Sequence, residues 1–284
     1  AGGSVSHAQE EAHLRELCHL SQHPFASEID GNHWILDAGD LRLKWERHNE
    51  FSSYTFFRPR QSGDGPRTTA LDAFPRDWVA AIPGMLVVAT HLEFCTPQER
   101  PPAVWLKALE TSPSTQVVTW VAEGAALVVS DFLIHDGFNH VTVIDVNLKP
   151  RQSARTIQRL LEIETYRIMA LLAFPIAKEV SSLLASCEKA TAELMTRMSD
   201  ELTHEDEYAI LSALTKLAAE LELSVARTTF RFGAAQAYSS LVEQRVIDLE
   251  ATSVPGFPSI GGFLRRRLSP AMQTCHSVAQ RQID

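Results

Sequence analysis

The sequence of 284 residues is poor in cysteine, and its cysteines form no short motif. There are four, widely separated and without a CxxC pair, which excludes a zinc ribbon and a dithiol redox site. Stable disulfides are rare in the cytosol, so isolated cysteines are typical of reduced thiols in that compartment. We therefore expect a cytoplasmic protein with four free thiols, at Cys18, Cys95, Cys187 and Cys275.

Long apolar runs are also missing. The longest, residues 168–177, is about half of the roughly 20 residues that a transmembrane helix needs, and it contains Pro175. The first residues, Ala1 to Ser4, include neither an initiator methionine nor an apolar signal core, as is typical of an expression scar or a truncated start. No segment of this sequence is therefore expected to cross a membrane.

Positive charge is scarce and unevenly distributed. Lys and Arg number 26 against 35 Asp and Glu, a net charge of −9, which argues against nucleic-acid binding because phosphates require a basic surface. Residues 1–150 carry 11 basic and 19 acidic side chains, whereas residues 151–284 carry 15 and 16. The one basic run is Arg265, Arg266 and Arg267. These arginines would meet anionic headgroups if their helix lay close to a membrane, and would otherwise form a solvated helix face.

The common catalytic signatures GxxxxGK[ST], GxGxxG after a strand, GxSxG and HExxH do not occur. Nucleotide-binding and serine-hydrolase functions therefore have no motif to support them. The composition, 45% hydrophobic and 21% charged, is that of an ordinary soluble globular protein. Its length suits one large domain or two smaller ones.

Short apolar runs between turn residues indicate strands in the first half. Residues 10–20 and 77–81 have helical patterns, and the continuous apolar run at 85–91 is of strand length. The pattern predicts an α+β domain over residues 5–149, with a mainly antiparallel sheet and flanking helices. The other strands are expected at 34–36, 41–45, 54–57, 116–122, 126–132 and 140–146.

After Pro150 the pattern changes to helix. Apolar residues recur every three or four positions over residues 157–194 and again over 211–249. This spacing predicts a long antiparallel, coiled-coil-like helical hairpin in a second domain, residues 150–284. Residues 260–280 are expected to form the beginning of a third helix.

The second long helix has the most regular pattern of the chain. Thr203 and Asp206 form a capping-box sequence at its start. Its seam, the side that packs on the first helix, is expected at Leu211, Leu214, Ala218, Leu221, Val225, Thr228, Phe232, Ala235, Ser239, Val242, Val246 and Leu249.

Glu164 falls at a seam position where an apolar residue is expected. A buried carboxylate without a partner is costly, so Arg231, Tyr238 or Arg245 on the returning helix would have to meet it. Such a pair would fix the register of the helices, or the same region would form a pocket for an anion or a metabolite. The candidate binding residues here are Arg159, Glu162, Glu164, Arg167 and Arg245.

A second group of candidates combines histidines with carboxylates. Glu46, His48 and Glu50 alternate along a strand-like segment and would project from one sheet face, as a general base or as ligands of a divalent ion. The alternative is a solvated sheet face. His91 and His135 would complete a metal site with His48 if the fold brings them together. No motif predicts a cofactor. If these residues hold one, it would be a divalent metal ion.

Five long, unusual strings occur in the order LKWERHNEF (43–51), YTFFR (54–58), DFLIH (131–135), RLLEIETYR (159–167) and LVEQR (241–245). In these the chain resembles, from about Val5 to its end, an uncharacterised bacterial family of predicted membrane-anchored proteins with a domain of unknown function. The resemblance implies additional N-terminal residues and a C-terminal hydrophobic anchor in the complete proteins. This chain would then be a soluble part at the cytoplasmic face of the bacterial inner membrane. The resemblance implies no activity.

Two classes of function stay open. One is a sensor, scaffold or adaptor that binds a ligand or a protein partner, or associates with itself through its helices, and reaches the membrane through the C-terminal anchor. The other is a metal-dependent enzyme or a divalent-cation-binding regulatory domain that uses the region of His48 and His135. Nucleic acid is not expected as a partner.

Overall fold

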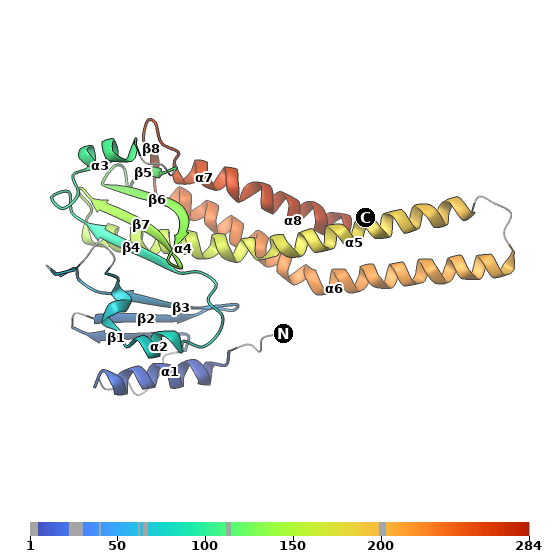
Figure 1. Cartoon of the computed structure of the whole chain (residues 1–284), viewed down its shortest axis with the longest axis horizontal. Coiled ribbons are helices and arrows are strands. Elements are labelled where there is room, and N and C mark those ends of the chain that lie inside the picture. Colours follow the sequence, from blue (N-terminus) through green and yellow to red (C-terminus); the bar gives the residue numbers. More distant parts are fainter. Residues whose placement is uncertain are drawn as a thin grey trace. The chain divides into compact units, whose positions relative to one another are not determined.

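In the computed structural model (Figure 1) the described residues are 5–22, 31–39, 41–61, 63–64, 68–111, 115–198 and 203–283. The chain forms two compact units, Ala1–Leu86 and Val87–Asp284. The α+β class is confirmed, with strands in the first half and a long helical hairpin in the second. The predicted turn between the long helices includes residues 199–202, which lie outside the described residues.

The first unit packs one helix on a three-stranded antiparallel sheet. Helix α1 (His7–Leu20) starts at a capping box in which Ser6 and Gln9 exchange hydrogen bonds. The strands pair in chain order, and alternate residues such as Trp34 and Trp45 turn into the core. The other elements of this unit are β1 (His33–Ala38), β2 (Leu41–Arg47), β3 (Ser52–Phe57), the 3-10 helix η1 (Ala70–Ala73) and α2 (Arg76–Ala80).

The second unit contains a five-stranded sheet in the order β4-β7-β6-β5-β8. Its pairs are antiparallel except for β4 and β7, which run parallel and so depart from the predicted antiparallel pattern. The strands of the chain thus form two sheets, whereas one was predicted. Helix α3 (Pro102–Leu109) was not predicted; its side chains pack on one sheet face, beside Leu127 and Ile144. The strands are β4 (Thr90–Cys95), β5 (Val117–Val121), β6 (Ala126–His135), β7 (Phe138–Asp145) and β8 (Thr252–Ser253).

The strand predicted at 85–91 lies further along the chain. Strand β4 begins at Thr90, and Met85 and Leu86 are exposed rather than paired in a sheet. The parallel register of β4 on β7 places His91 beside His140. The apolar run therefore indicated a strand in this region but placed it several residues too early.

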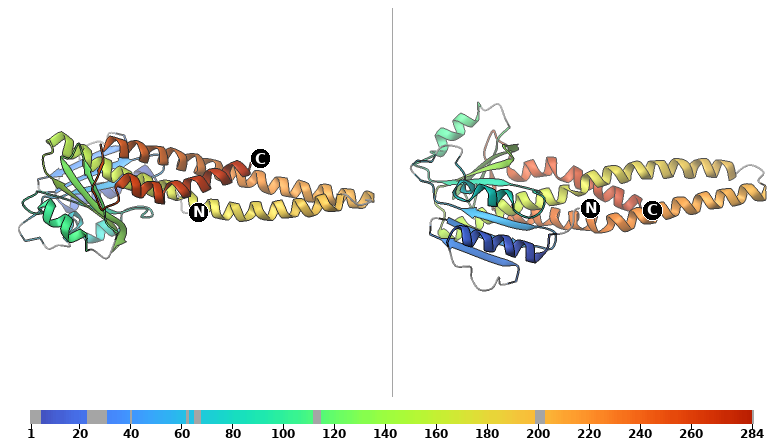
Figure 2. Two further views of the ribbon diagram at one scale, coloured as in Figure 1. Left: turned by 90° about the horizontal axis from the view of Figure 1, so that it is seen from above. Right: turned by 60° about the horizontal axis from the view of Figure 1, so that its bottom comes forward.

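The long helices pack antiparallel in the second unit (Figure 2). The first is bent: α4 (Pro150–Leu171) and α5 (Ala173–Met198) meet at Leu172, three residues before Pro175, whose missing N–H weakens the helical ladder there. Helix α6 (His204–Asp248) returns from the capping box of Thr203 and Asp206, as predicted. Two shorter helices follow, α7 (Ile260–Arg267) and α8 (Ser269–Arg281).

The seam of α6 differs from the prediction in its first half. Ile210 and Ser224 are buried, whereas Leu211 is 62% exposed. From Thr228 to Leu249 the buried residues are those predicted, apart from Val246, which is half-buried. The sequence pattern placed Leu211 and Val225 in the seam, but the direction of the helix axis buries their neighbours Ile210 and Ser224 instead.

The change from sheet to helix lies between Asp145, the end of β7, and Pro150, the start of α4. The compact units, however, divide between Leu86 and Val87 rather than after residue 149. The second sheet stays with the helices because Val128 and Val143 on its inner face share one core with residues of α4, α6 and α7.

The continuous helix Pro150–Met198 contains an 18-residue window with a mean hydropathy of 1.6, a third of which is buried. Length and composition would let this helix cross a membrane, but the core helix of a soluble protein passes the same test. The expectation that no segment could span a bilayer counted only uninterrupted apolar residues, and therefore did not find it.

Candidate functional sites

Charged side chains of α4 and α6 meet at the end of α6. The Arg245 guanidinium donates from Nε to the Glu162 carboxylate and from Nη1 to Oδ2 of Asp248, at 3.2 Å. Arg159 donates to the main-chain oxygen of Asp248 at 2.5 Å. The bond to Glu162 raises the pKa of Arg245, and a hydrogen bond from Gln244, together with Arg159, lowers that of Asp248. The structure thus brings together Arg159, Glu162 and Arg245.

Glu164 is 2% exposed, and its partner is one turn away on the same helix. Arg167 donates to both carboxylate oxygens, at 2.8 and 2.5 Å. Arg245, one of the three partners predicted for Glu164, binds Glu162 instead. The Arg167 guanidinium lies 5.7 Å from the ring centre of Phe132, which stacks on Phe263 at 4.5 Å and so links α4, β6 and α7.

The first of these clusters joins α4 to α6, and the second pairs two residues of α4. Each of the four carboxylate oxygens of Glu162 and Glu164 accepts a hydrogen bond from the chain, Gln158 supplying the one not provided by arginine. Every one of these oxygens therefore already has a partner within the chain, and Glu164 is buried. The arrangement therefore favours the structural interpretation of these residues over an anion or metabolite pocket.

The expected row of Glu46, His48 and Glu50 is not formed. Strand β2 ends at Arg47, so the alternation that would place all three side chains on one face stops before His48. Glu46 forms an ion pair with Lys44 at 2.8 Å, and His48 stacks on Phe51. A hydrogen bond from the His48 N–H to the Phe51 carbonyl closes a turn there, which is why the strand ends.

Three histidines gather on the second sheet. The ring centres of His91 and His140 are 5.5 Å apart, those of His135 and His140 are 6.0 Å apart, and His135 Nε2 lies 2.8 Å from Asp131 Oδ2. His91 and His135, two of the predicted metal candidates, are therefore neighbours through His140, which the sequence pattern did not single out. Over the part of the chain that the structure describes, no group of three or more His, Cys, Asp or Glu side chains is arranged to hold a metal ion.

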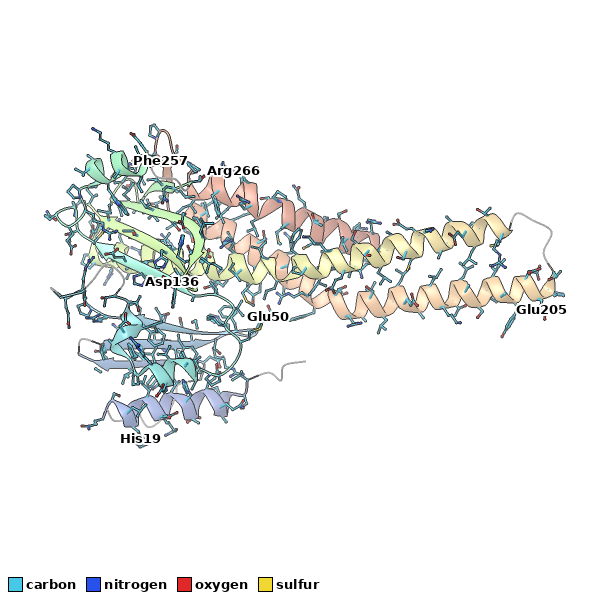
Figure 3. All side chains as sticks on the ribbon, in the orientation of Figure 1. His19, Glu50, Asp136, Glu205, Phe257 and Arg266 are labelled. Atoms are coloured by element: carbon cyan, nitrogen blue, oxygen red, sulfur yellow. The ribbon has the colours of Figure 1, made fainter. Side chains whose placement is uncertain are left out.

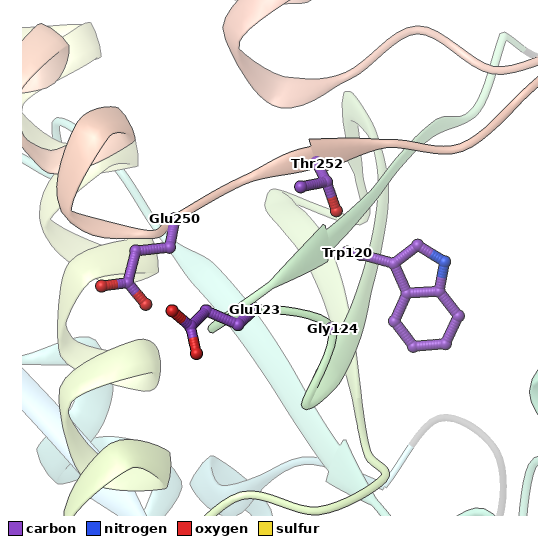
Figure 4. A pocket seen from close by; sticks show the side chains of 5 residues that line it. All are labelled: Trp120, Glu123, Gly124, Glu250 and Thr252. Atoms are coloured by element: carbon purple, nitrogen blue, oxygen red, sulfur yellow. The ribbon is translucent and has the colours of Figure 1, made fainter.

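An open hollow of about 740 Å³ lies beside β5 and β8 (Figure 4). Glu123 and Glu250 both have left-handed backbones, with φ of 57° and 50°, and their carboxylates lie on the same side of the hollow. Trp120 lies on the other side. Neither glutamate was predicted, because the pairing of β5 with β8 beside which they lie was not indicated by the sequence pattern. The lining residues are Trp120, Glu123, Gly124, Glu250 and Thr252.

The first unit buries two polar groups that the sequence pattern did not indicate. Glu10 is 2% exposed and accepts a hydrogen bond from Arg47, which also donates to the Val5 carbonyl at 2.8 Å. His13 is buried and stacks on Trp78 at 4.3 Å. Both lie on the apolar face of α1, and their helical spacing from Leu14 and Leu17 could have shown that they are buried.

The arginines of the basic run, Arg265, Arg266 and Arg267, are all exposed in the last turn of α7. Figure 3 labels Arg266. Cations near a helix C-terminus interact favourably with the helix dipole. This local role accounts for the run without a partner, and the lipid-contact hypothesis stays a prediction.

One stripe along the exposed side of α6 carries little charge, while exposed charged residues such as Lys216, Glu220, Arg227 and Glu243 lie to its sides. Successive helix residues turn by about 100°, so Ala226 lies opposite the buried Ser224 and Thr228. The outer face of α6, as we name this surface, contains one charged residue, Glu222. It consists of exposed residues only: Tyr208, Leu211, Ser212, Thr215, Ala219, Glu222, Leu223, Ala226, Thr229, Phe230, Gly233, Ala237, Ser240 and Leu241.

Single exposed apolar residues are normal on proteins, but a continuous stripe with a single charged residue is informative. Gly233 is a second unusual feature of this face, since it lies inside a helix, where glycine costs about 1 kcal/mol relative to alanine. A Cβ added there would meet no atom of the described chain within 4 Å, so no contact within it requires the glycine.

Comparison with known proteins gives one family match. The model of a "Protein of unknown function (DUF3422)" matches residues 3–284. No curated protein and no solved structure matches the chain.

Proposed function

The chain belongs to the DUF3422 family of proteins of unknown function. From its most distinctive surface we propose that it is a scaffold or adaptor. Its helical arm, by which we mean the long helices α4, α5 and α6, binds other protein chains. The observation that carries this proposal is the outer face of α6, which has a single charged residue. Tyr208 and Phe230, at 76% and 72% exposed, project from it into solvent. Large aromatic side chains of this kind supply much of the binding energy at protein interfaces.

The helical arm is long and rigid, as is typical of helices that present a binding surface. Helix α6 has 45 residues, which correspond to about 65 Å at 1.5 Å per residue. Its inner face packs on α4, α5, α7 and α8. The ion pair Glu162–Arg245 joins α4 to α6 at the base of the arm. A rigid helix held in this way presents its free side without paying much ordering entropy on binding.

Site-specific photo-crosslinking in the cells of origin tests the proposal. A photoreactive phenylalanine at position 230 or 223 should give a defined protein adduct, because both side chains lie on the outer face. The same group at Lys189, an exposed residue of α5, should give none. The adduct is then identified by mass spectrometry, and purified partner should bind the Phe230→Glu variant at least tenfold more weakly. The absence of any adduct from the outer face, or equal adducts from all three positions, would overturn the proposal.

A further inference from the structure

The residues of the outer face of α6 and of its edges also indicate which partner it binds. Resting on the proposed function, we infer that this partner is a second copy of the same chain, bound with the two α6 helices parallel. Three features of the helix support this occupant: the heptad spacing of its small residues, the charges at its two edges, and its area.

Small residues recur at every seventh position of the outer face, at Ser212, Ala219, Ala226, Gly233 and Ser240. A heptad repeat keeps one side of a helix facing a partner helix along its length. When two copies lie parallel and in register, each small residue is opposite its own counterpart, and the two backbones can approach closely. Gly233, which no contact within the described chain requires, then allows the closest approach.

The charges at the edges of the face select the parallel arrangement. Glu222 lies on one edge and Arg227, five residues later, on the other, and both are exposed. In a parallel pair, opposite edges of the two helices meet, so Glu222 of each copy faces Arg227 of the other. In an antiparallel pair related by a twofold axis, equivalent edges would meet instead. Glu222 and Arg227 therefore form attractive pairs between the copies only when the two helices are parallel.

The area of the face fits a reversible dimer. From Tyr208 to Leu241 the face is about 50 Å long at 1.5 Å per residue, and a helix-wide strip about 10 Å across would bury about 1,000 Å² in total. That value lies below the roughly 1,200 Å² at which stable interfaces begin and is typical of weak, transient ones. Association is therefore expected in the micromolar range, where a few side chains decide it.

Sedimentation velocity of the 284-residue chain from 1 to 200 µM tests the inference. The wild-type chain should form dimers, and Phe230→Glu should raise the Kd at least tenfold. Glu222→Arg alone and Arg227→Glu alone should each do the same, because each creates two like-charge contacts. An equimolar mixture of these two single variants should regain dimers, since both contacts between unlike copies are attractive. Lys189→Glu, a charge reversal on exposed α5, should leave the Kd unchanged within about threefold.

A chain that stays monomeric throughout this range would overturn the inference. So would single variants that dimerise normally, or a mixture that fails to regain dimers. These failures are distinguishable from failure of the proposed function. If photo-crosslinking from position 230 gives an adduct with a different protein, the adaptor proposal stands without self-association. If it gives no adduct and the chain is monomeric, both proposals fail.

Discussion

The Arg167 guanidinium donates two hydrogen bonds, at 2.8 and 2.5 Å, to the carboxylate of Glu164 one turn earlier in α4. Glu164 is 2% exposed, so both of its oxygens depend on this arginine. A buried, two-bonded ion pair adds little net stability compared with an apolar pair, yet removing one partner leaves an uncompensated charge. The pair therefore constrains how α4 packs more than it strengthens the fold.

We expect Arg167→Leu to lower the free energy of unfolding of the second unit by about 3 kcal/mol, because Glu164 keeps its charge without a donor. The double variant Glu164→Leu/Arg167→Leu should be within about 1 kcal/mol of the wild type or more stable. Urea unfolding followed by circular dichroism measures both. Arg281→Leu, which removes a more exposed ion pair with Glu188, is the control and should change stability by less than about 1 kcal/mol. Equal midpoints for Arg167→Leu and wild type would contradict the buried-charge argument.

The Glu162–Arg245 pair makes the corresponding tie between α4 and α6, and it is only partly exposed. Removing Arg245 as Arg245→Gln should cost about 1–2 kcal/mol, since a charge-assisted hydrogen bond between two elements is lost. In a double-mutant cycle with Glu162→Gln, the coupling should be about 1 kcal/mol or more. The exposed pair Lys189–Glu193, at 3.9 Å, should show a coupling near zero. Equal coupling energies for the two pairs would show that burial does not matter here.

Local sequence patterns predicted most of the fold. Capping signals such as Thr203 with Asp206, and the apolar spacing of the long helices, depend on neighbours along the chain, so they can be read without the structure. The parallel pairing of β4 with β7 could not be read in this way. Which strand lies beside which depends on contacts between distant residues, and an apolar run is compatible with either direction.

The candidate sites also depend on contacts between distant residues, and these could not be predicted from local sequence patterns. Glu164 was recognised as a residue that needs a partner, but Arg245 binds Glu162 instead, because the helical register that decides these pairs depends on packing across the whole arm. The outer face of α6 was missed because an exposed stripe is recognisable only once the buried stripe is known. A shift of the seam by one residue, from Leu211 to Ile210, turns a core leucine into a surface leucine.

The cysteines give a test of the core. All four are buried, and burial raises the pKa of the thiols of Cys18, Cys187 and Cys275. Because the thiolate is the reactive form, we expect the native chain at pH 7.5 to react with a disulfide reagent at least ~10-fold more slowly than the unfolded chain. In guanidinium chloride all four should react. A Lys189→Cys variant supplies a matched exposed thiol and should react at once. Rapid modification of the native wild type would show that the cores open readily.

His13 gives the first unit a dependence on pH. Burial lowers the pKa of His13 from its usual 6.5, an effect that the nearby Glu16 partly opposes. Its Nε2 is buried and has no hydrogen-bond partner in the part of the chain that the structure describes. The folded state therefore binds a proton at His13 less readily than the unfolded state does. As the pH falls below about 6.5 the unfolded state gains the proton first, and stability is lost until the pH passes the folded pKa.

The expected result is a fall in the free energy of unfolding of this unit between pH 7.5 and 5.5, which His13→Phe should reduce. Phenylalanine keeps the stacking on Trp78, at 4.3 Å in the wild type, but cannot bind a proton. Urea unfolding monitored by tryptophan fluorescence is suitable, because the core of this unit contains three tryptophans, Trp34, Trp45 and Trp78. His33→Phe is the matched control, since His33 is exposed in the same unit, and it should keep the wild-type slope. Should His13→Phe and the wild type lose stability in parallel over this range, the pH dependence must come from other groups, and the buried imidazole would not be its source.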